Sequence, residues 1–475
     1  DAHGSFIYVR PAGSSVPSSV TSHPAPDARA IYRSTFHTDR VCFDALWLSL
    51  KVHTTVWVSP EDDIELRKVM VSNLSDEVME LEVISALDIT LASHAADEAH
   101  PAFSNLFIEA DWLPAQQALR FVRTPRLQTE TTLQAAHFLA NTSTQAASQS
   151  AGCEPGFSPG HAQVLELRCQ TDRQLWLGRN HTPSQPLAWL TRVPEAATTL
   201  VTGLDPVAAL GVTLRIAPGA QACLTFATAA SHDPATLLAI IDKYRQPTYV
   251  ERASVMSATL ASIQWASARP HRDYLPVLQA LTTALVFTLP KVRVAVPATL
   301  ADALAAVNKA PNTHTTQPFA AAATTDRRVL WQLGISGDRP LVLVMAGSLQ
   351  GLALLRTLAQ ALREWARGGV ACDMIMLSSE PHSYLMPLQQ ELALLREHHA
   401  ADLQMHTGPV VTSLHVLRCD ELSAQQRGTL ASLARITLQA DGQTLVYQVT
   451  AWATAHGAFN ASSWRGCASD GVAAH

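Results

Sequence analysis

The chain has 475 residues, of which 47% are apolar and 16% charged, and its formal net charge is −6. This length exceeds what one hydrophobic core usually organises, so it predicts two to three domains, and the apolar fraction excludes a wholly disordered chain. The lack of a basic excess argues against a nucleic-acid-binding protein, because such proteins neutralise phosphates with Lys and Arg. The small share of charged residues favours neutral ligands or partner domains.

A period of two dominates the first 230 residues. Leu46, Leu48, Leu50 and Val52 occupy alternate positions, which predicts one half-buried strand. Several such strands at short spacing predict packed antiparallel sheets, and hence a large β-sandwich. Residues 141–160 are small and polar with Gly and Pro, so we expect them to form a surface loop within that domain.

Two antiparallel hairpins are predicted in this domain. The first joins 69–71 to 79–83 through the turn-rich residues 73–76. The second joins 212–216 to 222–226 across Pro218-Gly219.

Helical spacing replaces the period of two at about residue 231. Asp233-Pro234 provides a cap and a first-turn proline, and we predict a helical region over 231–307 with a break near Pro270. Residues 308–325 are expected to be a linker.

Residues 326–450 are expected to form a small α/β unit. Its predicted strands are 341–345, 370–377 and 414–417. Its predicted helices are 352–365, which ends at Gly368-Gly369, and 384–398. This βαβαβ order predicts a parallel sheet with right-handed crossovers, and 451–475 is expected to be an irregular tail.

The cysteines and the chain start indicate the class of protein. The seven cysteines contain no CxxC pair, so neither a zinc knuckle nor a thioredoxin-type site is indicated, and a reducing compartment fits best. The chain begins at Asp1 with no visible signal peptide. Polar residues interrupt the most apolar stretch, 341–362, so we expect a soluble chain without a membrane span.

Common catalytic and nucleotide-binding signatures are absent from the sequence. Gly347-Ser348 follows a predicted strand and could hold a phosphate, but every parallel α/β unit has such a turn, so we favour a structural role. His398 and His399 are expected to close a helix, where imidazolium complements the negative end of the dipole. We predict no catalytic residue, metal site or cofactor, since no pair of carboxylates can be assigned as acid and base from spacing.

The densest group of polar and aromatic residues lies between 94 and 105. Hydrogen-bonding groups for sugar hydroxyls and an apolar face for a sugar ring are offered there by Asp97, His100, Phe103, Ser104 and Asn105. The alternative is a loop whose side chains cap its own backbone.

Several runs resemble the family 94 glycoside hydrolase region, formerly glycosyltransferase family 36, of the cyclic β-1,2-glucan synthase family. The longest are 58–67, 73–75 and 95–107. Shorter matches follow the expected order and include 4–10, 171–173 with 178–179, 204–207, 330–331 with 334–338, and 416–418. Residues 326–329 and the last 25 residues depart from the family pattern.

The small α/β unit is predicted from periodicity alone. The resemblance implies the rest of an α+β multidomain chain: a large antiparallel β-supersandwich of carbohydrate-binding type (1–230), then a helical segment. It also implies a piece of a longer inner-membrane protein, with this chain on the cytoplasmic side beside a barrel and a glucosyltransferase domain. β-1,2-glucan or a related glucan is the implied ligand. Because the resemblance omits the barrel with its catalytic aspartate and the glucosyltransferase, no catalytic residue is carried over.

We therefore expect a carbohydrate-binding, scaffolding portion of such a synthase. Whether the chain is itself an enzyme stays open at this point. The alternatives are a self-sufficient glucan phosphorylase, a nucleotide-sugar glycosyltransferase that uses the α/β unit, and a degenerate fragment without activity.

Overall fold

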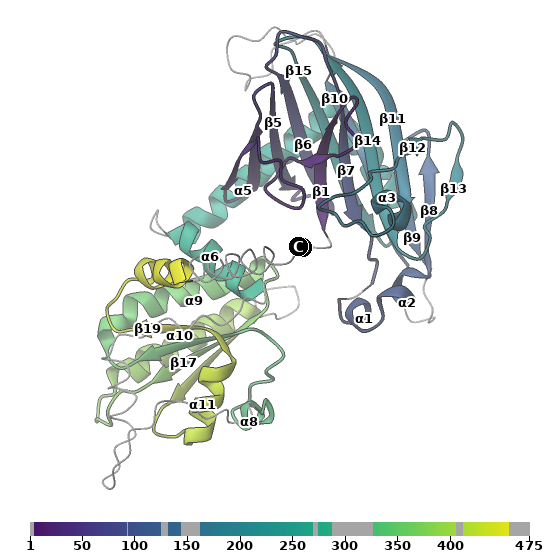
Figure 1. Cartoon of the computed structure of the whole chain (residues 1–475). Helices are drawn as coiled ribbons and strands as arrows, with labels where there is room; N and C mark the ends of the chain where they lie inside the picture. The colour runs from purple at the N-terminus through teal and green to yellow at the C-terminus, as the bar shows by residue number, and fades with distance from the viewer. Residues whose placement is uncertain are drawn as a thin grey trace, which may run out of the picture. The chain divides into compact units, whose positions relative to one another are not determined.

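The computed structural model describes residues 4–92, 94–124, 132–143, 162–268, 274–286, 326–404 and 412–455. The chain divides into two compact units, Asp1–Ser267 and Ala268–His475 (Figure 1). The division lies within 231–307, so that predicted helical region contributes to both units. The predicted loop 141–160 is described only to residue 143, where its strand ends. The break near Pro270 and the linker 308–325 lie outside the described residues.

Unit 1 contains two antiparallel sheets. Among the described residues, the first has the order β12 (Thr191–Arg192), β11 (Ala162–Asp172), β14 (Pro206–Ile216), β7 (Met79–Asp88), β1 (Ser5–Pro11), β2 (Ser18–Ser19). The second, wider sheet has the order β13 (Thr198–Leu200), β8 (Ile108–Leu113), β9 (Ala118–Arg123), β10 (Leu133–Ser143), β15 (Gln221–Ser231), β6 (Ile64–Asn73), β5 (Leu50–Val58), β4 (Arg40–Leu46), β3 (Ile31–Phe36). The predicted supersandwich is therefore present.

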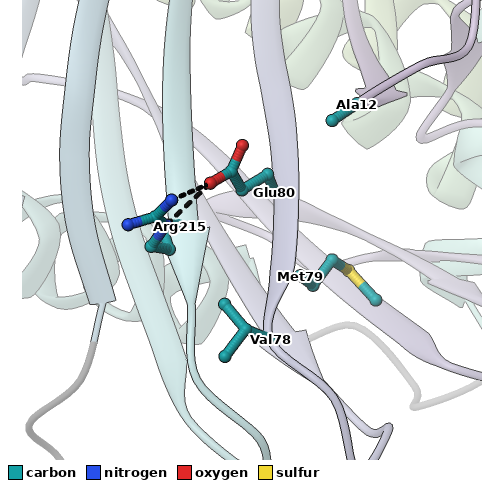
Figure 2. Close-up of a pocket in the computed structure, with 5 residues that line it drawn as sticks. All are labelled: Ala12, Val78, Met79, Glu80 and Arg215. Atoms are coloured by element: carbon teal, nitrogen blue, oxygen red, sulfur yellow. Dashed lines mark hydrogen bonds and ion pairs between the residues drawn. The ribbon is translucent and has the colours of Figure 1, made fainter.

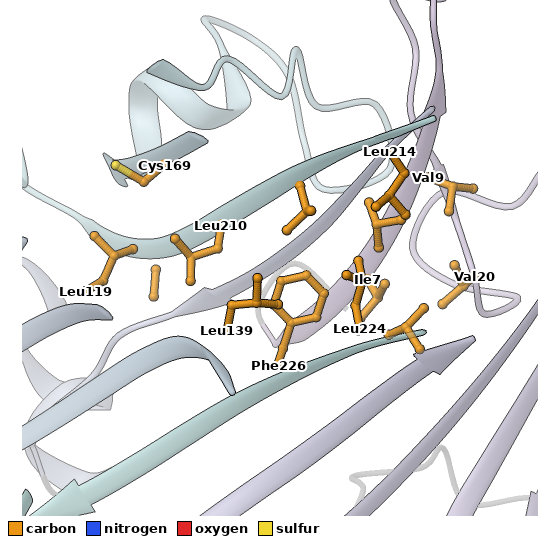
Figure 3. Packing of buried hydrophobic residues seen from close by; sticks show 14 of the residues in the cluster. Ile7, Val9, Val20, Leu119, Leu139, Cys169, Leu210, Leu214, Leu224 and Phe226 are labelled. Atoms are coloured by element: carbon orange, nitrogen blue, oxygen red, sulfur yellow. The ribbon is translucent and has the colours of Figure 1, made fainter. Parts of the chain in front are cut away.

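The main core of unit 1 lies between these sheets. Figure 3 shows Ile7 and Leu210 of the first sheet pointing toward Leu139 and Phe226 of the second. All four side chains are at most 8% exposed. Full burial of an aliphatic or aromatic side chain contributes about 1.5–3 kcal/mol, so this layer holds the two sheets together.

The strand predicted over 46–52 is wrong as a single element. β4 ends at Leu46, β5 begins at Leu50, and the backbone N–H of Trp47 donates to the carbonyl of Leu50 at 2.8 Å. Leu48 is therefore at the tip of a tight turn and is 99% exposed, whereas Val52 is fully buried. The alternate leucines therefore continue through the turn between β4 and β5, where the chain reverses its direction, and they do not mark a single strand.

Both predicted hairpins are also wrong. β6 and β7 belong to different sheets, and so do β14 and β15. Each connection therefore crosses from one layer of the sandwich to the other instead of joining neighbouring strands. The pattern gave the correct buried face in both cases, since Val69, Leu81, Leu214 and Leu224 all point into the shared core. A period of two identifies a face but does not identify the pairing partner.

Asn73 ties the two crossings together. Its Nδ2 donates to the carbonyls of Glu77 at 2.7 Å, Ile216 at 3.0 Å and Ala217 at 3.2 Å. Its Oδ1 accepts from the backbone N–H and the hydroxyl of Ser75. The residue is fully buried, so these bonds replace water completely.

We expect Asn73→Ala to lower the free energy of unfolding by about 2–3 kcal/mol, because it leaves the buried carbonyl of Ile216 without a donor and removes the bonds to the carbonyls of Glu77 and Ala217. Urea unfolding measures the change. Asn73→Asp keeps the acceptor but replaces the Nδ2 donor with an oxygen that faces the same carbonyl oxygens, so it should be at least as damaging, while Ser75→Ala should cost less than about 1 kcal/mol. An Asn73→Asp variant as stable as wild type would contradict this role for the amide.

Helices cover the outer faces of the sandwich. α4 (Pro234–Tyr244) begins as predicted, since Asp233 accepts from the backbone N–H of Thr236 at 2.8 Å and Pro234 stands in the first turn. Its apolar side packs on the wider sheet, with Ile241 against the cluster that contains Phe138. α5 (Pro247–Ala268) follows, and α3 (Arg173–Leu177) covers the other sheet.

Unit 2 contains the predicted parallel sheet, with one strand more than expected. The order is β18 (Thr412–Arg418), β17 (Cys372–Ser378), β16 (Leu341–Ala346), β19 (Ala434–Ala440), and the described neighbours are all parallel. The other elements are α6 (Tyr274–Val286), α8 (Arg328–Trp331), the 3-10 turn η1 (Leu349–Gly351), α9 (Leu352–Arg367), α10 (Pro387–Gln404) and α11 (Ala424–Leu433).

Three details of unit 2 differ from the sequence analysis. A helix over 445–455 runs into the predicted irregular tail, of which 456–475 lies outside the described residues. α10 continues past His398 and His399 to Gln404, so these residues do not close it. His399 is 5% exposed, and burial lowers the pKa of its imidazole, so the predicted imidazolium at the helix end is wrong for this residue.

The described cysteines are free thiols. Cys169, Cys372 and Cys419 are buried, and burial raises the pKa of Cys169 to about 11 and of Cys372 to about 12. These three behave as small apolar residues, as predicted. Cys153 and Cys467 lie outside the described residues.

Candidate functional site

Residues 94–105 form two short helices rather than a loop. α1 (His94–Ala99) and α2 (Pro101–Asn105) connect β7 to β8 and lie beyond the ends of the strands (Figure 1). The five predicted site residues separate into two groups. Asp97 is partly exposed, and His100 and Phe103 are exposed. Ser104 and Asn105 are buried, at 4% and 9% exposure.

The buried part of this segment joins a network that we call the rim network: Asp88, Asn105, Arg173 and Asp205. Asn105 Nδ2 donates to Asp205 Oδ1 at 3.1 Å. Arg173 donates through Nε to Asp88 Oδ1 at 2.8 Å and through Nη1 to Asp205 Oδ2 at 3.5 Å. Asp88 ends β7, Asn105 ends α2, Arg173 begins α3 directly after β11, and Asp205 lies in the turn before β14, so the network fixes α2 to the end of the first sheet.

The rim network is closely packed underneath. Gly4 donates its backbone N–H to Asp88 Oδ2 at 3.1 Å, and Tyr8 donates its hydroxyl to the carbonyl of Pro183 at 2.9 Å. Burial, followed by the nearby charge of Asp88, raises the pKa of Tyr8. The cavity between these groups has a volume of about 10 Å³, which is room for about one water molecule. A sugar therefore cannot enter here and would have to bind on the outer surface.

The role of Asp88, Arg173 and Asp205 was not predicted. Two of them lie in short family matches, 171–173 and 204–207, to which the sequence assigns no function. The neighbouring Asp172 caps α3, since its Oδ1 accepts from the backbone N–H groups of Gln174 and Leu175. The sequence shows that these polar residues lie at the ends of predicted strands. It does not show that they meet, because that depends on the order of the strands in the sheet.

The exposed side of the segment is aromatic and apolar. The Phe103 ring is 45% exposed and meets Phe107 edge to face, with centroids 5.5 Å apart. Leu106 is 60% exposed, and Leu204, beside the network residue Asp205, is 73% exposed. Phe103 and Leu106 therefore leave apolar surface exposed on this segment, as a surface that meets a ligand or another domain does.

An open recess of about 650 Å³ lies elsewhere on unit 1 (Figure 2). It is lined by Ala12, Val78, Met79, Glu80 and Arg215. Arg215 Nε donates to Glu80 Oε1 at 2.7 Å, so the two charges are paired. Glu80 stands near the start of β7 and Asp88 at its end, about 25–30 Å apart along an extended strand. The recess therefore includes none of the predicted carbohydrate-binding residues.

The Gly347-Ser348 turn of unit 2 has a structural explanation. Ser348 caps η1 through a bond from the backbone N–H of Gln350 to its Oγ. A Cβ on Gly351 would lie 2.1 Å from the carbonyl oxygen of Ala440, so η1 packs directly on the backbone at the end of β19. The described residues contain no group of three or more His, Cys, Asp or Glu placed to hold a metal ion. Among them, no helix is both long and apolar enough to cross a membrane.

Comparison with known proteins finds a family whose domain covers the sandwich. The model of the glycosyl hydrolase 94 supersandwich domain matches residues 1–247. A cyclic beta-(1,2)-glucan synthase, NdvB from Rhizobium meliloti (strain 1021), is 24% identical over 94% of this chain, which spans about 14% of that relative.

Solved structures give weaker likenesses. A bacterial glucoamylase complexed with acarbose has a TM-score of 0.33 at 7% identity, covering 58% of this chain and 34% of its own. An alpha-galactosidase from Lactobacillus brevis has a TM-score of 0.22 at 8% identity, covering 94% of this chain and 64% of its own. The family match, in contrast, extends over more than half of the sequence and agrees with the two-sheet architecture of unit 1. The chain therefore belongs to the glycosyl hydrolase 94 supersandwich family.

Proposed function

We propose that this chain is the carbohydrate-binding, scaffolding portion of a cyclic β-1,2-glucan synthase, with a role in β-glucan synthesis and chain-length processing. The family membership and the similarity to a glucan synthase along most of the chain support this proposal. Its partners would then be β-1,2-glucan or a related glucan and the neighbouring barrel and glucosyltransferase domains of a longer protein. That protein would sit in the inner membrane, with this portion on the cytoplasmic side.

The observation that carries the proposal is that residues 94–105 contain a buried group that holds the segment in place and an exposed group that a ligand can reach. Asn105 is buried and bonded to Asp205, so it fixes the position of α2. Ser104, also buried, contributes to the same inner side. Asp97, His100 and Phe103 are left on the accessible side, next to each other along the two helices. An exposed aromatic ring with polar neighbours, on a segment that buried contacts hold in place, is typical of a sugar-binding surface.

An uncharged glucan fits these groups. The flat ring of Phe103 can stack on the apolar face of a glucose unit, while Asp97 and His100 can hydrogen-bond to its hydroxyls. The exposed Leu106 and Leu204 extend the surface with aliphatic groups. We propose that these side chains meet a neighbouring domain, which gives the scaffolding role its contact area.

The test is calorimetric titration of the chain with linear and cyclic β-1,2-glucans. We expect Phe103→Ala to weaken binding roughly threefold to tenfold, because a favourable ring contact contributes about 0.5–1.5 kcal/mol. Phe36→Ala, at a phenylalanine that is 58% exposed on β3, is the matched control and should bind like wild type. An absence of heat at millimolar glucan, or equal effects of the two variants, would remove the proposed binding role of this segment.

A further inference from the structure

A cluster of charged side chains stands at one edge of the parallel sheet of unit 2. β17 and β18 are neighbours and end at Ser378 and Arg418, so their carboxyl ends meet at that edge. The loop after β17 and the turn after β18 bring Glu380, His382 and Asp420 to this place.

Asp420 holds the two basic groups of the cluster. Arg418 donates through Nε to Oδ1 at 3.0 Å and through Nη2 to Oδ2 at 2.7 Å. His382 Nε2 lies 2.6 Å from the same Oδ2. The Arg418 side chain is only 9% exposed, whereas that of His382 is 76% exposed. The same His382 Nε2 also lies 3.4 Å from Arg418 Nη2, so the imidazole is held through this one nitrogen while most of the ring stays exposed.

The loop that carries His382 is anchored on both sides. Met386 places its sulfur 3.6 Å from Arg418 Nη1, so residues 382 and 386 both contact the same guanidinium. Ser383 Oγ accepts from the backbone N–H of Met386 at 3.1 Å. Met386 has φ +33°, a left-handed conformation that costs free energy for a residue with a Cβ and persists only where contacts enforce it.

We call residues 380–386 the arch. α10 begins directly after it, and the arch also caps this helix. The carboxylate of Glu380 accepts from the backbone N–H groups of Leu388 at 3.0 Å and Gln389 at 2.9 Å. The arch is therefore held at its start by the cap and at its end by the contact of Met386 with Arg418.

Tyr384 stands between these anchors and is completely exposed. It is two residues from both His382 and Met386, so its Cα lies within about 8 Å of theirs. A large aromatic side chain held entirely in solvent on a constrained arch, beside an oriented imidazole, has no packing role in unit 2.

The charges indicate the class of ligand. Glu421 adds an ion pair with Arg418 at 3.7 Å, so one guanidinium pairs with two carboxylates, those of Asp420 and Glu421. Its Nη2 also donates to the backbone carbonyl of Glu380 at 3.4 Å. An excess of negative groups disfavours phosphate or another anion. The described residues also offer no set of three ligands for a metal ion. What is left is a ring surface, a hydrogen-bonding imidazole and carboxylate lone pairs, which together suit a neutral polyhydroxyl compound.

We propose that this edge of unit 2 is a second sugar-binding site, in which Tyr384 stacks on a glucose ring and His382 and Asp420 hydrogen-bond to its hydroxyls. The site shares no residue with the segment 94–105 of unit 1. It can therefore exist whether or not the glucan contact proposed there is correct.

The experiment uses the full chain and sophorose, the β-1,2-linked glucose disaccharide, with saturation-transfer NMR as the readout of binding. Tyr384→Ala should weaken binding at this site at least threefold and should not affect folding, since the side chain is fully exposed. Tyr447→Ala, at a tyrosine that is 64% exposed elsewhere in unit 2, is the matched control and should change nothing.

Measuring both variants also in a Phe103→Ala background separates this site from that of unit 1. A loss of the remaining signal on Tyr384→Ala in that background supports the proposal. It is overturned if wild type shows no saturation transfer, if Tyr384→Ala binds like wild type in both backgrounds, or if Phe103→Ala alone removes all binding. The last result would leave the function proposed for unit 1 intact.

Discussion

Gly351→Ala is expected to lower the free energy of unfolding of unit 2 by more than about 3 kcal/mol. The added Cβ would lie 2.1 Å from the carbonyl oxygen and 2.4 Å from the carbonyl carbon of Ala440. These are backbone atoms at the end of β19, which pairs with β16, so no side-chain rotation relieves the clash. Amide hydrogen exchange of β16, β19 and α9, measured at increasing urea concentration, reports the loss for unit 2 alone.

Gly347→Ala is the matched control in the same turn. Its Cβ would approach Ser379 Oγ at 3.1 Å, a side-chain atom that can move away. We expect a change of less than about 1 kcal/mol. Equal destabilisation by the two variants would contradict the view that this turn is shaped by the packing of η1 on β19.

Arg173→Met is expected to cost about 2–4 kcal/mol and to release α1 and α2 from the sandwich. The guanidinium is 16% exposed, and its partner Asp88 is 19% exposed, so removing it leaves a largely buried carboxylate without its cation. The contribution of Asp205 is smaller, because that side chain is 46% exposed and water screens it. Unfolding in urea gives the free energy, and amide hydrogen exchange over 94–107 reports the loosening.

Arg120→Met provides the comparison for Arg173. Arg120 pairs with Asp111 at 2.7 Å, at 28% and 24% side-chain exposure, on β9 and β8. Loss of that pair should not accelerate exchange in 94–107. If Arg173→Met leaves exchange in this segment as slow as in wild type, the rim network does not hold α2.

Local signals in the sequence predicted local structure well. Asp233 with Pro234 marks the start of α4, and Gly368-Gly369 marks the end of α9, because caps and terminators act within a few residues. The parallel sheet of unit 2 follows from its alternation of strands and helices. β19 was not predicted from this pattern, although it completes the same sheet beside β16.

Pairing across the sandwich could not be read in the same way. Val71 and Leu81 both face the shared core, yet β6 and β7 lie in different sheets. A turn after Asn73 fits a hairpin and a crossing equally well at the level of residue types. The distinction depends on bonds from Asn73 to Ile216 and Ala217, more than 140 residues away.

The candidate site shows the same limit. Phe103 and Asn105 were both predicted as sugar ligands because of their side-chain chemistry. Asn105 proves to be buried against Asp205, 100 residues along the chain, while Phe103 is open to solvent. Residue type defines what a side chain can bind, but burial decides whether a ligand can reach it.

Hydrogen–deuterium exchange with and without linear β-1,2-glucan shows which backbone segments of unit 1 the ligand protects. We expect slower exchange over 96–107, where α1 and α2 present Asp97, His100 and Phe103, and no change near Glu80 and Arg215. If saturating glucan leaves exchange over 96–107 unchanged, or slows exchange only at the recess around Glu80, the proposed binding surface is wrong.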